Sequence, residues 1–388
     1  MDQNQRWANE LLTKVVAKYR WVAAKTGDKI PYTTDKAGNF DNHSLLSGPL
    51  ADQNNISWWT NGFYPGLLWQ LYTLEPASVF QTNAQNIEMK LATSLQLFDG
   101  LSHDVGFMFF PTSVYHYALT GDQLAKTRAM HAATILAGRY NIAGHFIKAW
   151  NPENGVSRAG WVIIDSLMNL ELLYWASAQS QDPRFALIAD AHAHTVAKYF
   201  IRANGSVKHI CQFDPATGIY LQSLGGQGYG HGSAWTRGQA WAIYGLTACY
   251  ARTGTDYYRQ QAQKVAAYVL SQLPKNLLVP IDFNQPAQPA WIDSSAQAIL
   301  ASGLLSLAQV TEDTDSQHYY QTAVALLKTL VAQCSDFSKA CDNLITKASA
   351  QYHEPSHEYP IIYADYYFVE ALLKLTKQDL AARIWQKN

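Results

Sequence analysis

Two kinds of helical pattern alternate along this chain of 388 residues, and the alternation limits the folds open to it. One kind is amphipathic: in the segment 319–331, apolar side chains recur at three-to-four spacing and leave the other face polar. The other kind is apolar on nearly every side, as in the segment 299–305. A helix of the second kind belongs in an interior, and helices of the first kind cover it.

Each pattern occurs six times. Amphipathic helices are expected at about 2–24, 84–98, 123–140, 184–201, 256–272 and 316–333. Apolar helices are expected to begin near Trp58, Val105, Val162, Trp235, Ile292 and Ile361. Several joints between the two kinds combine a helix-ending Gly or Pro with a capping Asp, as in 120–122 and 181–183.

Six outer and six inner helices predict an all-α fold, an (α/α)6 barrel in which residues 1–388 form one catalytic domain. The alternative is an open helical solenoid, which the lack of a fixed period of about 34 or 40 residues disfavours. Strand signals are sparse, with one short strand expected at Leu277–Phe283. In a closed ring, the residues that open the inner helices meet at one mouth, where we expect the chemistry.

Charge and composition exclude several classes of partner. A formal net charge of -1 predicts neither nucleic-acid nor membrane binding. The first 24 residues lack the basic and apolar regions of a signal peptide, and no apolar run reaches membrane-spanning length. Four cysteines without CxxC spacing predict reduced thiols in a cytoplasmic protein. The 12 Trp and 23 Tyr suit a sugar-binding site, where flat rings pack on sugar faces.

Two carboxylates open inner helices. Asp165 precedes an apolar stretch, and Asp104 lies in His103-Asp104-Val105-Gly106-Phe107. Either residue alone is equally compatible with a helix cap. Two carboxylates at one mouth favour glycosidic chemistry, for which apolar surroundings raise the pKa of the acid.

A third motif contains Arg237 and Trp241, which are four residues apart and share a helix face. A guanidinium with nearby indoles suits an anionic sugar, although a surface arginine beside core tryptophans is the alternative. The Gly-rich run 223–232 misses both nucleotide fingerprints and is interpreted as a flexible site loop. The two histidine pairs, at positions 192/194 and 353/357, each lack a convincing third metal ligand, so no metal or cofactor is expected.

Six motifs, in order, make the chain resemble the unsaturated glucuronyl hydrolases, glycoside hydrolase family 88. Their residues are 57–63, 103–107, 149–150, 163–170, 235–241 and 365–372. The resemblance covers almost the whole chain and implies an (α/α)6 barrel. It implies that Asp165 is the catalytic acid/base and Asp104 an assisting carboxylate. It further implies a substrate-binding lining of Trp59, His103, Trp150, His209, Gln227, Trp235, Arg237, Trp241, Tyr352 and His353.

The chain departs from the family pattern at two places. Asn61 stands where Asp is common, and the segment 352–358 is shorter than in many relatives. Relatives that favour sulphated substrates carry a pattern of two serines and a lysine, to which His353, Ser356 and Glu358 are expected to correspond. An acidic residue in the lysine's place predicts a preference for unsulphated substrates.

The resemblance implies an unusual reaction on an unsaturated uronyl oligosaccharide. The chain is expected to be a monomer or a homodimer. Asp165 would protonate C4 of the C4=C5 double bond left by a polysaccharide lyase, and water would add to C5. The alternatives are an unsaturated rhamnogalacturonyl hydrolase, a sugar 2-epimerase on the same barrel, and a glycan-binding barrel without catalysis. The two carboxylates argue against the epimerase, which is expected to use histidines.

Overall fold

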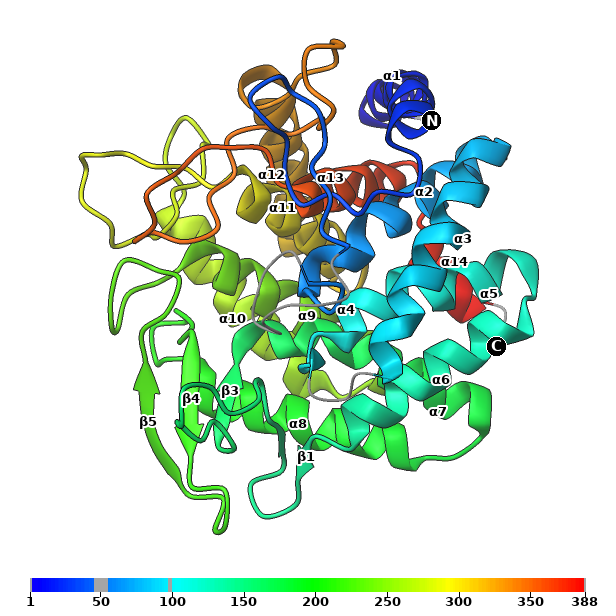
Figure 1. Ribbon diagram of the computed structural model, residues 1–388. Coiled ribbons are helices and arrows are strands. Elements are labelled where there is room, and N and C mark those ends of the chain that lie inside the picture. Colours follow the sequence, from blue (N-terminus) through cyan, green and yellow to red (C-terminus); the bar gives the residue numbers. More distant parts are fainter. Residues whose placement is uncertain (1, 45–54, 97–99, 387–388) are drawn as a thin grey trace.

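The computed structural model describes residues 2–44, 55–96 and 100–386, and helices dominate it (Figure 1). The outer helices are α1 (Gln3–Thr26), α3 (Ser78–Ala92), α6 (Gln123–Ala137), α8 (Arg184–Phe200), α10 (Asp256–Gln272) and α12 (Asp313–Gln333). The inner helices are α2 (Phe63–Leu74), α4 (Val105–Phe109) continued as α5 (Tyr115–Thr120), α7 (Leu170–Ser180), α9 (Thr236–Thr253), α11 (Ser294–Gln309) and α13 (Ile362–Leu375).

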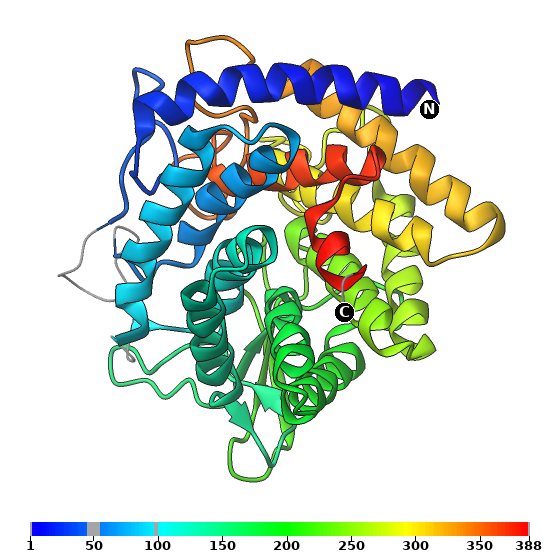
Figure 2. The same ribbon diagram turned by 90° about the vertical axis from the view of Figure 1, so that its right-hand side faces the viewer.

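The inner helices close into a ring (Figure 2). Along the chain α4 contacts α7, α7 contacts α9, α9 contacts α11 and α11 contacts α13. The ring closes because α2, the first inner helix, contacts both α13 and α5, the end of the second inner helix. The predicted all-α (α/α)6 barrel is therefore confirmed, and the open solenoid is wrong.

Burial follows the two sequence patterns. In α11 every residue from Ser294 to Leu305 is buried, so this helix is enclosed on all sides. In α10 the buried residues form a single stripe of Tyr258, Ala262, Val265, Ala266 and Val269. One face packs on the ring and the other meets solvent, as an amphipathic pattern requires.

The second inner helix is interrupted. Between α4 and α5 the residues Phe110–Val114 form one π-helical turn that contains Pro111. Proline has no N–H to continue the α-helical ladder, so the local hydrogen-bond register changes there. Gly121, with φ 76°, then ends α5 in the left-handed conformation.

The structure corrects two expectations on local structure. The inner helix expected from Val162 begins only at Leu170. Residues Trp161–Ile163 form strand β3, and Ile164–Asn169 form a 3-10 helix, η5. The strand expected at Leu277–Phe283 is absent from the described residues; that stretch makes only isolated bridges, Pro280 with Ile292 and Asp282 with Trp235.

A sheet that the sequence pattern did not indicate lies beside the ring mouth. Its antiparallel order is β3, β4 (Ile210–Phe213) and β5 (Tyr220–Leu224), with Val162 opposite Cys211. The β-branched run before Asp165 is extended because it pairs with β4, about fifty residues along the chain. A second pair, β1 (Tyr140–Asn141) and β2 (Phe146–Ile147), begins where the helix expected to reach residue 140 has already ended.

The bounds of one outer helix differ from those expected, and one further helix lies at the C-terminal end. The outer helix expected at 84–98 runs from Ser78 to Ala92, followed by a 3-10 turn at Thr93–Gln96; residues 97 and 98 lie outside the described part. An extra helix, α14 (Leu380–Gln386), contacts α5. Among the described helices none combines the length and apolar character needed to span a bilayer.

Candidate active site

A cavity of about 760 Å³ opens where the inner helices begin. Asp104 reaches it from the start of α4, Asp165 from η5, and Arg237 and Trp241 from α9. Several loops complete its walls. The lining residues are Tyr32, Ser57, Trp58, Trp59, Gly100, Ser102, Asp104, Trp150, Asn151, Pro152, Glu153, Arg158, Ile163, Asp165, Gln227, Trp235, Arg237, Trp241, Ala350, Gln351, Glu354 and Tyr359.

The two carboxylates meet across a histidine. His103 Nε2 lies 3.4 Å from Asp104 Oδ1 and 3.8 Å from Asp165 Oδ1. Asp104 also accepts a hydrogen bond of 2.6 Å from the Ser102 hydroxyl. The alternative reading of both residues as caps fails: Asp104 makes no side-chain capping bond, and Asp165 lies inside η5.

A glycine brings the two segments together. A Cβ on Gly106 would lie 2.5 Å from Asn169 Cα, so only glycine lets α4 approach η5 this closely. The adjacent Phe107 N–H donates to Asn169 Oδ1 at 2.7 Å, which ties the helix after Asp104 to the helix that carries Asp165.

A buried hydrogen-bond chain fixes η5 from behind. His192 Nδ1 accepts from the Ile147 N–H at 2.9 Å, and its Nε2 lies 2.8 Å from Ser166 Oγ. Ser166 donates to the Ile163 carbonyl at 2.6 Å. Burial lowers the pKa of His192 to about 3, so the ring stays neutral and holds Ser166, and with it η5, in position. Both ring nitrogens are used within the protein, which leaves His192 unavailable to a metal.

Asp165 is the carboxyl group set apart by its surroundings. Its side chain is 14% exposed, and Oδ1 is buried without a hydrogen-bond partner among the described residues. Burial raises the pKa of Asp165 well above its ordinary value, and the negative charge of Asp104 raises it further, against an opposing effect of Arg237. A carboxyl group that keeps its proton to higher pH than usual, and that faces an open cavity, is what a general acid requires.

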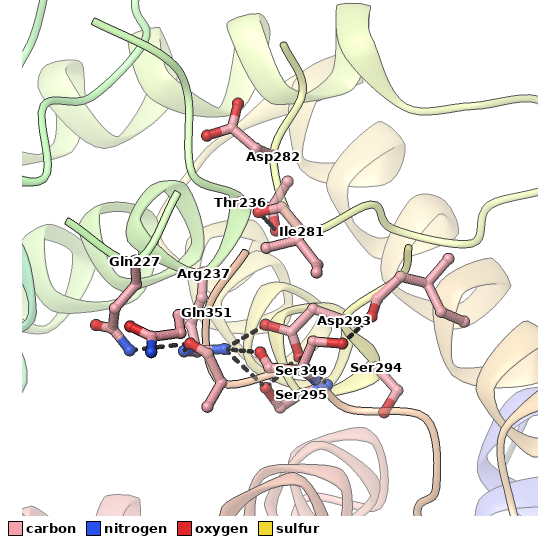
Figure 3. Close-up of polar contacts among 12 residues, drawn as sticks. Gln227, Thr236, Arg237, Ile281, Asp282, Asp293, Ser294, Ser295, Ser349 and Gln351 are labelled. Atoms are coloured by element: carbon pink, nitrogen blue, oxygen red, sulfur yellow. Dashed lines mark hydrogen bonds and ion pairs between the residues drawn. The ribbon is translucent and has the colours of Figure 1, made fainter. Parts of the chain in front are cut away.

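Arg237 is engaged from inside the protein, as Figure 3 shows. Its Nη1 pairs with Asp293 and donates to the Ser349 carbonyl at 2.8 Å, and its Nη2 donates to the Ala350 carbonyl. The guanidinium also lies 4.6 Å from the Trp235 ring. The alternative of a surface arginine is wrong, since the side chain is 1% exposed. We expected Arg237 to bind a sugar carboxylate directly, but these terminal nitrogens already donate hydrogen bonds within the protein.

A second group of predicted residues lies behind and beside Trp235. The His209 ring lies 4.3 Å from the Trp235 ring, and its Nδ1 accepts from the Gln227 N–H at 3.0 Å. Burial, with the charge of Arg237, lowers the pKa of His209 to about 3. Gln227 also donates to the Ala350 carbonyl at 2.9 Å (Figure 3). The Gly-rich run is anchored by Asp282, which accepts from the Tyr229 and Ala234 N–H groups.

The C-terminal lining differs from the expectation. Tyr352 and His353 do not line the cavity; Tyr352 N–H donates to the Gln227 carbonyl, and His353 Nε2 lies 2.7 Å from the Tyr229 carbonyl. Glu358 is also away from the cavity, because its carboxylate accepts from the Ile292 N–H. The acidic residue of this segment that does face the cavity is Glu354. Glu358 therefore does not face the cavity as expected, and the predicted preference for unsulphated substrates loses its structural basis.

One cluster has the composition of a metal site. Ligand atoms of His103, Asp104 and Asp165 all lie within 4.8 Å of one another. The histidine pairs considered from the sequence do not form such a group: His192 is fully bonded, and His357 stacks on Trp291 with its Nε2 near the Tyr352 carbonyl.

Sequence reasoning missed four charged residues: Glu153, Arg158 and Glu354 line the cavity, and Asp293 lies behind it. Asp293, the partner of Arg237, opens the inner helix α11 and could have been found by the signal that pointed to Asp165. Arg158 and Glu153 face the cavity from a loop without any helical or strand pattern, so no periodic signal marks them.

The comparisons with known proteins agree with one another. A sequence profile of Glycosyl Hydrolase Family 88 matches residues 33–368. The chain is 32% identical to the unsaturated glucuronyl hydrolase of Bacillus sp. (strain GL1), over 91% of this chain and 92% of the relative. It is 31% identical to the unsaturated chondroitin disaccharide hydrolase of Streptococcus pneumoniae, over 85% and 84%. The crystal structure of the Bacillus sp. GL1 enzyme superposes with a TM-score of 0.85, at 29% identity and 96% coverage of each chain.

Proposed function

Because the chain belongs to glycosyl hydrolase family 88, we propose that it hydrolyses oligosaccharides that begin with an unsaturated glucuronyl residue. This is the C4=C5 sugar that polysaccharide lyases leave at a non-reducing end. Disaccharides from hyaluronan and chondroitin are the proposed substrates, in keeping with the names of the relatives.

The observation that carries the proposal is the state of Asp165. Its carboxyl group faces the cavity with an unpartnered buried oxygen, a raised pKa and a second carboxylate on the same histidine. Such a group keeps its proton to higher pH than an ordinary carboxyl group and can release it to the electron-rich C4 of the enol ether.

The chemistry needs one proton donor and one water. Asp165 transfers its proton to C4, while water adds to C5 and gives its own proton back to the Asp165 carboxylate. The product is a hemiketal at C5, which opens and releases the next sugar. The anomeric carbon is not attacked directly, so the distance between the two carboxylates does not decide stereochemistry in the way it does for ordinary glycosidases.

The remaining residues are proposed to bind the substrate and to adjust the pKa of Asp165. Asp104 is proposed to hold ring hydroxyls and to keep the pKa of Asp165 high. Trp59 and Trp150 offer ring faces for sugar stacking, whereas Trp241 is 1% exposed and packs against Phe107 and Tyr367 in the wall. Arg237 contributes positive potential near the substrate carboxylate, and Gln227 and Trp235 line the same wall. His103 and His209, predicted as lining residues, do not line the cavity: His209 supports Gln227 from behind, and His103 lies beside Asp104 and Asp165.

The test is ultraviolet absorbance during incubation with unsaturated disaccharides from hyaluronan, chondroitin, heparin, gellan and rhamnogalacturonan. Hydration removes the conjugated double bond, so absorbance falls with the glycosaminoglycan disaccharides. An epimerase would leave the absorbance unchanged, and a binding protein would show affinity without turnover. A fall with the rhamnogalacturonan substrate alone would replace the proposal by the pectin-directed activity.

We also propose that the chain acts in the cytoplasm as a single catalytic domain, as a monomer or homodimer, and without nucleic-acid or membrane partners. The four cysteines support the compartment: Cys211, Cys249, Cys334 and Cys341 are all unpaired, as thiols in a reducing compartment are. Cell fractionation and sedimentation of the purified protein test these two points.

A further inference from the structure

The loop between β2 and β3 forms one wall of the cavity. It supplies Trp150, Asn151, Pro152, Glu153 and Arg158 to the lining. Its base is closed by a hydrogen bond of 2.8 Å from the Ala149 N–H to the Trp161 carbonyl, and its tip by a bridge between Glu153 and Val156. The loop is therefore a folded hairpin with defined side-chain positions.

Arg158 is held on two indole rings. Its guanidinium carbon lies 5.6 Å from the Trp150 ring centroid and 5.5 Å from that of Trp161. Its Nη2 pairs with Glu153 at 2.5 Å, while its Nε is buried without a hydrogen-bond partner in the described part of the chain. A stacked guanidinium with an unused donor is poised to bind a further oxygen anion.

The two arginines of the cavity differ in what they can offer. Arg237 is 1% exposed and paired with the buried Asp293. The side chain of Arg158 is 27% exposed, and that of its partner Glu153 is 41% exposed. The partly exposed carboxylate of Glu153 can rotate toward solvent, which frees the Arg158 guanidinium for another anion. The fully buried Asp293 cannot move away from Arg237 in this way.

The position of Arg158 follows from a row of contacts. His103 lies 3.8 Å from Asp165, the Trp150 ring lies 6.5 Å from the His103 ring, and the Arg158 guanidinium lies 5.6 Å from the Trp150 ring. Arg158 and Asp165 line the same cavity, and these contacts separate them. Since the unsaturated ring must reach Asp165, we infer that the sugar that follows it lies beside Arg158.

We propose that Arg158 binds a sulphate group on the sugar next to the unsaturated uronate, and that Glu153 weakens this binding by competing for the guanidinium. This inference rests on the proposed function. A sulphate offers several acceptor oxygens to the guanidinium fork, and Glu153 acts as an internal substitute for it.

The experiment measures binding without turnover, by calorimetry on Asp165→Asn with unsulphated, 4-sulphated and 6-sulphated unsaturated chondroitin disaccharides. Adding Arg158→Gln is expected to weaken binding of at least one sulphated disaccharide by about tenfold more than that of the unsulphated one, the effect of one charged hydrogen bond. Adding Glu153→Gln instead is expected to strengthen binding of that same sulphated disaccharide. The matched pair changes the ratio in opposite directions, which a general loss of loop structure would not do.

Two results would overturn the proposal: an equal effect of Arg158→Gln on all three ligands, or an unchanged ratio in Glu153→Gln. Arg158→Lys keeps the charge but loses the fork, and should restore only part of the affinity for sulphate. Failure of the proposed function would be visible separately, as absent turnover of every disaccharide by the wild-type enzyme, because the binding ratios do not depend on turnover.

Discussion

Two carboxyl groups at different places in the barrel, one half-buried and one buried, have opposite environments. Asp165, at the cavity, has a buried oxygen without a partner and a neighbouring carboxylate. Glu370, in α13, accepts hydrogen bonds from the Tyr244 and Ser302 hydroxyls, and Lys374 Nζ lies 3.4 Å from it. Asp165 keeps an oxygen without a hydrogen bond where a substrate can enter, whereas both oxygens of Glu370 accept hydrogen bonds.

This difference distinguishes a residue proposed to be catalytic from residues that stabilise the fold, although all of them lie in motifs shared with the family. Both residues lie in segments that carry the family resemblance, 163–170 and 365–372. Asp365 in the second segment is likewise satisfied, by the Tyr19 hydroxyl and the N–H groups of Leu344 and Ile345. A shared motif therefore marks a reacting group only where the structure leaves the group unpaired.

The largest expected effect comes from removing the unpaired acid. Asp165→Asn should lower kcat by at least about 10² to 10⁴, the usual range for a lost general acid. Stability should not fall: the folded-state pKa of Asp165 is raised, so its ionised form disfavours folding once pH rises through that pKa, and the amide removes this effect at neutral pH. Absorbance assays and thermal unfolding measure both. Activity within tenfold of wild type would contradict the assignment.

The paired group should behave in the opposite way. Glu370→Gln leaves the Lys374 ammonium buried without this partner and should lower the free energy of unfolding by about 3 kcal/mol, with kcat of the folded enzyme unchanged. Denaturant titration measures the loss. The double variant Glu370→Gln with Lys374→Met is the control and should recover most of the stability. A collapse of kcat in the folded single variant would erase the contrast with Asp165.

A smaller effect tests how the two cavity carboxylates interact. Asp165 must be protonated to act as an acid, so the rate falls as pH rises through its raised pKa. Asp104→Asn removes a negative charge that raises the pKa of Asp165, and the basic limb of the kcat/KM profile should move to lower pH. Glu354→Gln is the matched control, since it also faces the cavity but has no part in that shift. Equal movement in both variants would contradict a specific interaction.

The contrast between these sites was only partly predictable from the sequence. Local periodicity located the inner and outer helices, because each helix carries its own pattern of apolar residues. A carboxylate before an apolar helix also marked Asp165 and Asp104. The extended conformation of residues 161–163 was not predictable, since it depends on pairing with Ile210–Gln212. Likewise, Asp293 meets Arg237 across 56 residues, and whether a charge is paired is decided by such distant contacts.

The smallest expected effect concerns metal ions, because their removal is expected to leave the activity unchanged. His103, Asp104 and Asp165 are close enough to share an ion, and in that case the unpaired oxygen of Asp165 would be a ligand instead of an acid. The proposed reaction needs only a proton and water, and a bound cation would lower the pKa of Asp165 and remove the proton the reaction uses. Exhaustive chelation should therefore leave kcat/KM and its pH profile unchanged. If activity disappeared and one added metal restored it, Asp165 would be a coordinating residue, and the comparison with Glu370 would become one between two paired carboxylates.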